Sequence, residues 1–157
     1  MREHIGWFRG KRIFNDEWVE GYFLQDREFY GKIDERSYIV NHKQPSGCFG
    51  SDIYFEVYPD TVGECTGLRD KNGKLIFEGD VLRIAQVGNG MGDYYFPPVE
   101  YPVKVVVRWD MCAWMWETLC EDKRFIGFPT AWCHYECEII GNVHDNPELL
   151  KGGEGDS

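Results

Sequence analysis

The sequence predicts an all-β protein with very little helix, built as a barrel or a sandwich. Short runs of alternating apolar and polar residues recur at roughly ten-residue spacing, with turn-forming residues between them. No long stretch repeats its apolar residues with the 3.6-residue period of an amphipathic helix. Because alternation with period two puts successive side chains on opposite faces of a strand, these runs indicate strands with one buried face.

The first expected element is an N-terminal hairpin. Residues 5–14 and 17–24 flank Asn15-Asp16, a pair that tolerates left-handed backbone and favours a two-residue loop. One face of the second arm carries Trp18, Glu20, Tyr22 and Leu24. Short strands are then expected at residues 37–40 and at residues 53–57.

The strongest short-range hairpin signal is Asn72-Gly73, which lies between two extended arms in residues 66–77. Turn-forming residues at 78–80 then introduce a strand with Leu82 and Ile84 on one face. Asn146 and Pro147 are suited to cap and begin a single helical turn. Later strands are expected at residues 103–109, at residues 112–119, which are apolar on both faces, and at residues 138–140.

Composition favours one domain over residues 1–150, with a Gly-rich, acidic and disordered tail at residues 151–157. The net charge of −10 repels a polyphosphate, so bulk charge opposes nucleic-acid binding. The N-terminus has no apolar signal-peptide core, and no run is long enough to span a bilayer. We therefore expect a cytoplasmic protein whose six cysteines are free thiols.

Three ordered blocks of the chain carry a resemblance to a known family. They are FRGKR (8–12) with EWVEGY (17–22), DTVGECTGLRDKNGK (60–74) with FEGDV (77–81), and IIGNVHDNPELL (139–150). Together they resemble the N-terminal, central and C-terminal signatures of YopX-like phage and prophage proteins. Cys65 departs from the family pattern, in which Tyr is common, and residues 85–101 and 111–137 match none of the signatures.

The resemblance implies an SH3-like barrel core over about residues 61–143, with the hairpin of residues 5–24 packed on it. It also implies a phage or prophage origin and work in the bacterial cytoplasm. It implies no chemistry, because the family has no established activity to transfer, and a fold alone cannot supply one.

The sharpest metal candidate is the pair Cys133 and Cys137, with His134 between them. On a strand these two cysteines lie about 13 Å apart, too far to share an ion. We therefore predict buried thiols, also for the possible partners Cys112 and Cys120, and no metal. Gly88–Gly92 is interpreted as a hairpin loop, because Pro97-Pro98 excludes the helix that a phosphate-binding loop needs, and no cofactor is expected.

Two pairs of side chains could serve acid–base chemistry, Glu78 with Asp80 and Asp110 with His134. Such pairs work only when unequal environments separate their pKa values, and the sequence shows no such environment. No nucleophile elbow, metalloprotease helix or P-loop is present either. We therefore expect a protein that is not an enzyme.

The surplus of aromatic residues is the clearest functional signal. A possible interaction surface comprises Trp114, Trp116, Trp132, Tyr135, Tyr94 and Tyr95. The alternative is that these rings fill the core of a small barrel. The leading hypothesis is an accessory protein that binds a protein partner or itself. The alternatives are an acidic mimic of nucleic acid, a hydrolase or transferase, and a nucleic-acid module that uses Arg9, Lys11, Arg12, Lys104 and Arg108.

Overall fold

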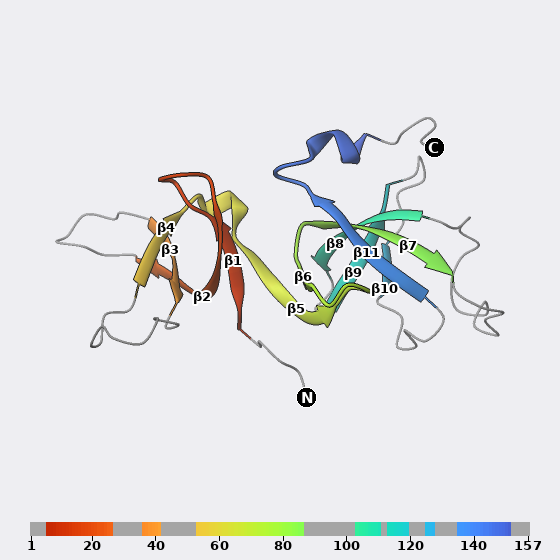
Figure 1. Ribbon diagram of the computed structural model, residues 1–157, viewed down its shortest axis with the longest axis horizontal. Coiled ribbons are helices and arrows are strands. Elements are labelled where there is room, and N and C mark those ends of the chain that lie inside the picture. The colour runs from red at the N-terminus through yellow and green to blue at the C-terminus, as the bar shows by residue number, and fades with distance from the viewer. Residues whose placement is uncertain are drawn as a thin grey trace. The chain divides into compact units, whose positions relative to one another are not determined.

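The computed structural model describes residues 6–26, 36–41, 53–86, 103–110, 113–119, 125–127 and 135–151. The chain divides into two compact units, residues 1–67 and residues 68–157, and the boundary falls inside one strand. Figure 1 shows strands in both units, and the described helical segments are two short 3-10 turns. The all-β prediction is confirmed. The assignment of residues 1–150 to one domain stays a prediction.

The N-terminal unit is an antiparallel meander of four strands. They are β1 (Phe8–Lys11), β2 (Trp18–Asp26), β3 (Arg36–Asn41) and β4 (Ile53–Val57). Strand β2 changes partner along its length, because its first half pairs with β1 and its second half with β3. The 3-10 turn η1 (Pro59–Thr61) leads into β5 (Gly63–Arg69), whose start pairs with β1.

The meander closes on itself at the end of β1. Arg12 forms an isolated bridge with Val57 of β4. Two backbone hydrogen bonds flank this bridge, from Ile13 N to Glu56 O (3.1 Å) and from Tyr58 N to Lys11 O (2.9 Å). Strand β4 is therefore bonded to β3 on one side and to the chain around Arg12 on the other. The hairpin expected at residues 5–24 is present, but it belongs to a closed four-stranded unit.

The loop between β1 and β2 is longer than expected. The ladder ends at the pair Lys11–Trp18, so residues 12–17 form the loop and the prediction of a two-residue loop is wrong. The physical reason is that the chain after Arg12 turns toward β4 before it returns to β2. Asp16 has a φ of +60°, so this position does use the left-handed backbone that was expected here.

The C-terminal unit contains a five-stranded antiparallel sheet in the order β10-β9-β8-β7-β11. Its strands are β7 (Asp80–Gln86), β8 (Val103–Asp110), β9 (Ala113–Thr118), β10 (Phe125–Gly127) and β11 (Tyr135–Asn142). The two end strands of this order do not pair with each other. The barrel expected over residues 61–143 is therefore not closed among the described residues, although its strands are present.

A hairpin packs against the core of this sheet. The hairpin consists of the end of β5 and β6 (Leu75–Phe77), joined at Asn72-Gly73 as predicted. It contributes Ile76, with half-buried Leu68 packed beside it, to the buried core. The sheet supplies the other members of this core, which are Leu82, Ile84, Val105, Val107, Trp116 and Cys137.

One carboxylate joins this hairpin to the edge of the sheet. Asp70 is only 6% exposed, and its Oδ1 accepts hydrogen bonds from Asn72 N and Lys74 N, both at 2.9 Å. Its Oδ2 accepts a hydrogen bond of 3.2 Å from Ile139 N in β11. The neighbouring Lys71 N donates to Cys137 O, also in β11, at 2.9 Å. Two edge-facing backbone groups of β11 are thus satisfied without a further strand.

The hydrogen bonds decide the charge of this carboxyl. Burial by itself would raise the pKa of Asp70, but three backbone N–H donors and the positive charge of Lys74 lower it below the ordinary value of 3.8. Asp70 is therefore a permanently charged acceptor at neutral pH.

The C-terminal turn forms where it was predicted. The 3-10 turn η3 (Pro147–Leu150) begins with Pro147 at its first position. Asn146 is at the cap position, but its side chain does not cap the turn, and its Oδ1 accepts from Asn142 N instead. Asn142 Oδ1 in turn accepts from His144 N and Asp145 N. This part of the C-terminal signature is thus a network that folds the chain back after β11.

Replacing Asp70 by Ala is expected to lower the free energy of unfolding by about 3 kcal/mol, because three backbone donors lose a charged acceptor. Urea denaturation followed by tryptophan fluorescence measures this change. The control is Asp60→Asn at an exposed carboxylate, where a change within about 0.5 kcal/mol is expected. Equal effects of the two substitutions would contradict the role given to Asp70.

The same carboxylate predicts a pH dependence. Because its folded-state pKa lies below 3.8, its contribution to stability is complete at neutral pH and is lost as the pH falls through the folded-state pKa. We expect the urea midpoint of the wild type to fall below about pH 4 more steeply than that of Asp70→Ala. Parallel pH profiles of the two proteins would rule this linkage out.

Replacing Gly21 by Ala is expected to destabilise the N-terminal unit by roughly 3 kcal/mol. A Cβ at this position would collide with the carbonyl oxygen of Val40, a backbone atom that cannot rotate away. Gly73→Ala is the matched control, because a Cβ there meets open space and only the φ of +80° adds strain, worth about 1 kcal/mol. Thermal denaturation of both variants tests the difference, and a larger loss for Gly73→Ala would refute it.

Candidate functional site

The aromatic residues that the sequence predicted to form one interaction surface lie in different environments. Trp116, in β9, is only 3% exposed and belongs to the core, which corrects its assignment to an interaction surface. Trp114 is half-buried, packs against the same core and makes an edge-to-face contact with Trp109 at 4.9 Å between ring centroids. Tyr135 is the first residue of β11. Trp132, Tyr94 and Tyr95 lie outside the described residues.

Asp80, one of the acid–base candidates, has a structural role. Asp80 is 1% exposed, and its Oδ2 accepts a hydrogen bond of 2.8 Å from Phe77 N, which closes the turn before β7. Gly79 in the same turn is bonded through its N–H to Val107 O, and its carbonyl accepts from Val143 N. The turn residues predicted to introduce β7 therefore also connect it to β8 and to the chain after β11. His134, the expected partner of Asp110, lies outside the described residues.

Cys137 is a buried thiol within the core. It is 3% exposed, and burial, with a smaller contribution from the charge of Asp70, raises its pKa to about 11. Such a thiol stays protonated at neutral pH, whereas zinc needs the thiolate. In the part of the chain that the structure describes, no three metal-ligating side chains come together. Cys112, Cys120, Cys133 and His134 fall outside that part, so the absence of a metal stays a prediction.

The guanidinium groups proposed for nucleic-acid contact are engaged within the protein. Arg9 lies over the ring of Trp18, 4.8 Å from its centroid. Arg108 of β8 forms an ion pair of 3.2 Å with Glu117 of β9. Arg12 makes both kinds of contact, with the ring of Phe55 and with the carboxylate of Glu17. The ion pairs of Arg12 and Arg108 offset positive charge that the strands could offer to phosphates, whereas Arg9 over Trp18 keeps its charge.

Exposed apolar side chains are concentrated in the N-terminal unit. Among the described residues, seven large hydrophobic side chains are exposed, and Trp109 is the only one of them in the C-terminal unit. The other six lie on β2, on β4 and in the segments that follow β1 and β4, and together we call them the N-terminal apolar surface: Ile13, Phe14, Tyr22, Leu24, Tyr54 and Tyr58. Clusters of exposed apolar side chains commonly mark interaction sites.

Three of these side chains lie on the outer face of the sheet. Tyr22 of β2 and Tyr54 of β4 both pair with Val40 of the central strand, so the three side chains form one cross-strand row. Leu24, Tyr38 and Glu56 form the next row on the same face. Tyr22 and Tyr54 are 50% and 55% exposed. This face is therefore apolar in its centre, and the ion pair of Arg36 with Glu56, at 4.0 Å, lies on it.

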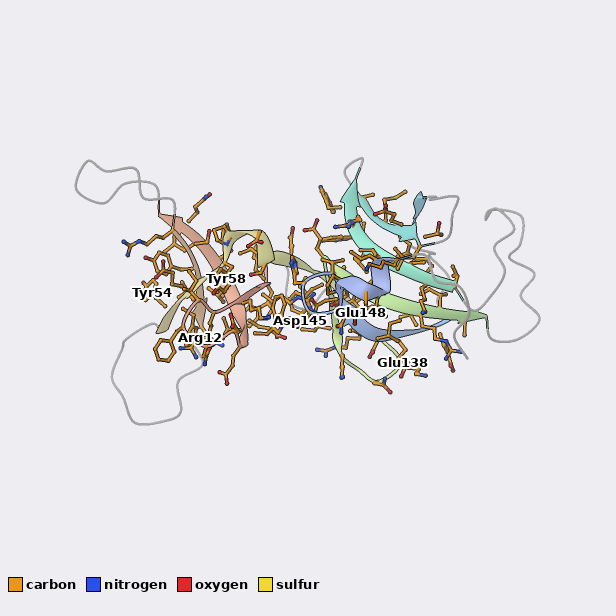
Figure 2. The ribbon with its side chains drawn as sticks, turned by 90° about the horizontal axis from the view of Figure 1, so that it is seen from above. Arg12, Tyr54, Tyr58, Glu138, Asp145 and Glu148 are labelled. Atoms are coloured by element: carbon orange, nitrogen blue, oxygen red, sulfur yellow. The ribbon has the colours of Figure 1, made fainter. Side chains whose placement is uncertain are left out.

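Arg12 contacts Phe14, which belongs with Ile13 and Tyr58 to the part of the N-terminal apolar surface that lies outside β2 and β4. Its guanidinium lies 4.6 Å from the ring centroid of Phe55 and 5.9 Å from that of Phe14. It also forms an ion pair of 3.7 Å with Glu17. Figure 2 shows Arg12 with Tyr54 and Tyr58 in the N-terminal unit, and shows Glu138, Asp145 and Glu148 in the C-terminal unit.

The sequence contained part of the signal for this surface. Alternation correctly placed Tyr22 and Leu24 on one face of a strand, and it separated Tyr54 and Glu56 from Phe55 and Val57. It could not show that the aromatic face of these strands points outward, because aromatic and β-branched side chains are usual on a buried face.

Among the described residues, no helix is long and apolar enough to cross a membrane. A comparison with solved structures finds similarity to the crystal structure of protein EF1440 from Enterococcus faecalis. The two chains are 21% identical with a TM-score of 0.46, over 92% of this chain and 96% of that chain. A comparison with curated proteins finds no match. The protein family described as YopX protein matches residues 7–151, and this chain therefore belongs to that family.

Proposed function

We propose that this YopX family member is a phage- or prophage-encoded accessory protein that binds another protein, or itself, in the bacterial cytoplasm. The binding surface is the N-terminal apolar surface, and the protein acts without catalysis. The observation that carries the proposal is that six of the seven exposed large hydrophobic side chains in the described residues lie in the N-terminal unit.

The composition of this surface supports a protein partner. Protein interfaces are enriched in Tyr, Phe, Trp and Arg at their centres, where a few such side chains supply most of the binding free energy. The outer face of β2, β3 and β4 offers two exposed tyrosines and a leucine around Val40. The apolar area of such a face contributes to the free energy of binding only when a partner covers it.

The described buried carboxylates support a role without catalysis. Asp70 and Asp80 accept hydrogen bonds from backbone N–H groups that hold turns and the edge of a sheet in place. A catalytic carboxylate needs instead an open position from which it can reach a substrate proton. Net charge supports a protein partner over nucleic acid, because acidic residues outnumber basic ones by 27 to 17.

The double substitution Leu24→Ser, Tyr54→Ser is expected to weaken partner capture about ten-fold or more, because two exposed anchors lose their apolar contact area. The measurement is quantitative mass spectrometry of proteins retained by the immobilised chain from a bacterial lysate. Light scattering of the free chain at micromolar concentration measures self-association in parallel.

Trp109→Ser provides the matched control, since Trp109 is exposed to a similar extent, 53%, but lies in the C-terminal unit. It is expected to leave capture and self-association unchanged. A wild-type chain that is strictly monomeric and retains nothing would overturn the proposed function, and a double variant that behaves like the wild type would rule out the sheet face as the binding surface.

A further inference from the structure

Phe14 is the most exposed large hydrophobic side chain among the described residues. It is 88% exposed, and its neighbour Ile13 is 43% exposed. Both lie in the loop between β1 and β2, beyond the last pair of the ladder. An isolated aromatic ring in water gains no burial energy from the fold, so the position calls for another explanation.

The loop that carries Phe14 is held in one conformation. Arg12 N donates to Glu17 O at 2.9 Å, and Asp16 N donates to Arg12 O at 3.0 Å. Asn15 Oδ1 accepts from Glu17 N, while Asn15 Nδ2 donates to a carboxylate oxygen of Glu17 at 2.8 Å. Ile13 N is bonded to Glu56 O, which fixes the start of the loop to β4.

The side chain of Arg12 supports the same arrangement. It is 25% exposed and contacts the rings of both Phe55 and Phe14, with Glu17 as its ion-pair partner. The guanidinium stacks on the half-buried Phe55, which belongs to β4, and so connects the exposed ring to the body of the unit. A ring presented in this way loses little conformational entropy when a partner covers it.

Acidic side chains outnumber basic ones in the loop, in the segments bonded to it and among their ion-pair partners. The acidic residues are Asp16, Glu17, Glu56 and Asp60, all exposed. The basic ones are Lys11, Arg12 and Arg36, of which Arg12 is paired with Glu17 and Arg36 with Glu56. The local charge is therefore weakly negative beside an apolar centre, in a chain whose net charge is −10.

We propose that Phe14, with Ile13 beside it, is an anchor that inserts into an apolar pocket on a different protein, and that basic side chains rim this pocket. The proposal rests on the proposed function and names the kind of partner. The exposed ring requires a concave receptor, and the exposed Asp16 of the same loop, in a chain whose net charge is −10, is complementary to a basic rim. An anionic bilayer and a second copy of this chain both carry negative charge and are disfavoured as occupants.

The test is site-specific photo-crosslinking of the full chain in bacterial cells. Benzoylphenylalanine replaces Phe14 in one variant and Trp109 in the control variant. Both side chains are exposed, and neither belongs to the core cluster. We expect an adduct between position 14 and a single cellular protein, at least about ten-fold stronger than any adduct of position 109. Mass spectrometry of the adduct must place the crosslink in an apolar pocket bordered by Lys or Arg.

The variant Asp16→Asn tests whether basic side chains rim the pocket. This change removes one carboxylate and keeps a residue that tolerates the left-handed backbone at this position. For this comparison the purified full chain is crosslinked in a bacterial lysate of adjusted salt concentration. The yield of the adduct at position 14 is expected to fall about three-fold at low salt, and the difference is expected to disappear near 0.5 M salt because screening removes it. A yield that does not change at low salt would refute the basic rim.

An adduct with lipid, an adduct with a second copy of the chain, or no adduct above the Trp109 control would overturn the anchor. Loss of capture by Leu24→Ser, Tyr54→Ser would in that case still uphold the proposed function through the sheet face. If instead the double variant captures normally and position 14 gives no adduct, both the anchor and the proposed function fail.

Discussion

The fold of the C-terminal unit depends on the charge and position of a single carboxylate. Asp70 accepts two hydrogen bonds from its own turn and a third from Ile139, sixty-nine residues further along the chain. The turn is therefore held in shape and held against β11 by the same group. Without this contact the β5–β6 hairpin would keep its local reversal but would lose one of its attachments to the sheet that it covers.

The position of the hairpin has consequences for the core. Ile76 of β6 is fully buried against residues from the sheet, and Cys137, whose carbonyl accepts from Lys71 N, is buried in the same cluster. Burial keeps the thiol of Cys137 protonated, and the nearby charge of Asp70 acts in the same direction. The chemistry available to this cysteine is thus set mainly by its burial in the core, and the charge of Asp70 adds to that effect.

The N-terminal unit reaches closure by backbone hydrogen bonds around Arg12 rather than by a large core. Ile39 and Val57 are fully buried, and Gly21 leaves room for the close approach of β3. A unit of this size has a high ratio of surface to volume, so it buries a smaller share of its apolar side chains than a larger one does. The exposed tyrosines follow from this geometry, whereas Phe14 lies in a loop beyond the ladder of β1 and β2. Together these side chains make this unit the better candidate for recognition.

Local sequence patterns determined several elements of this protein. Asn72-Gly73 determined the position of a hairpin, and Pro147 determined the start of the last turn. The alternation of residues in β2 and β4 assigned each side chain to one face of its strand. These features arise from backbone preferences and hydrogen bonds among near neighbours, which a sequence displays directly. The resemblance of the three blocks likewise identified the family correctly.

Only the tertiary structure decided which faces are buried and which contacts join distant segments. The bridge of Arg12 with Val57 and the bond of Asp70 to Ile139 connect residues far apart in the chain, and no local pattern specifies them. For the same reason Trp116 lies in the core while Tyr54, an equally plausible core residue by composition, is exposed. Burial depends on what packs against a strand, and that is a property of the whole chain rather than of the strand.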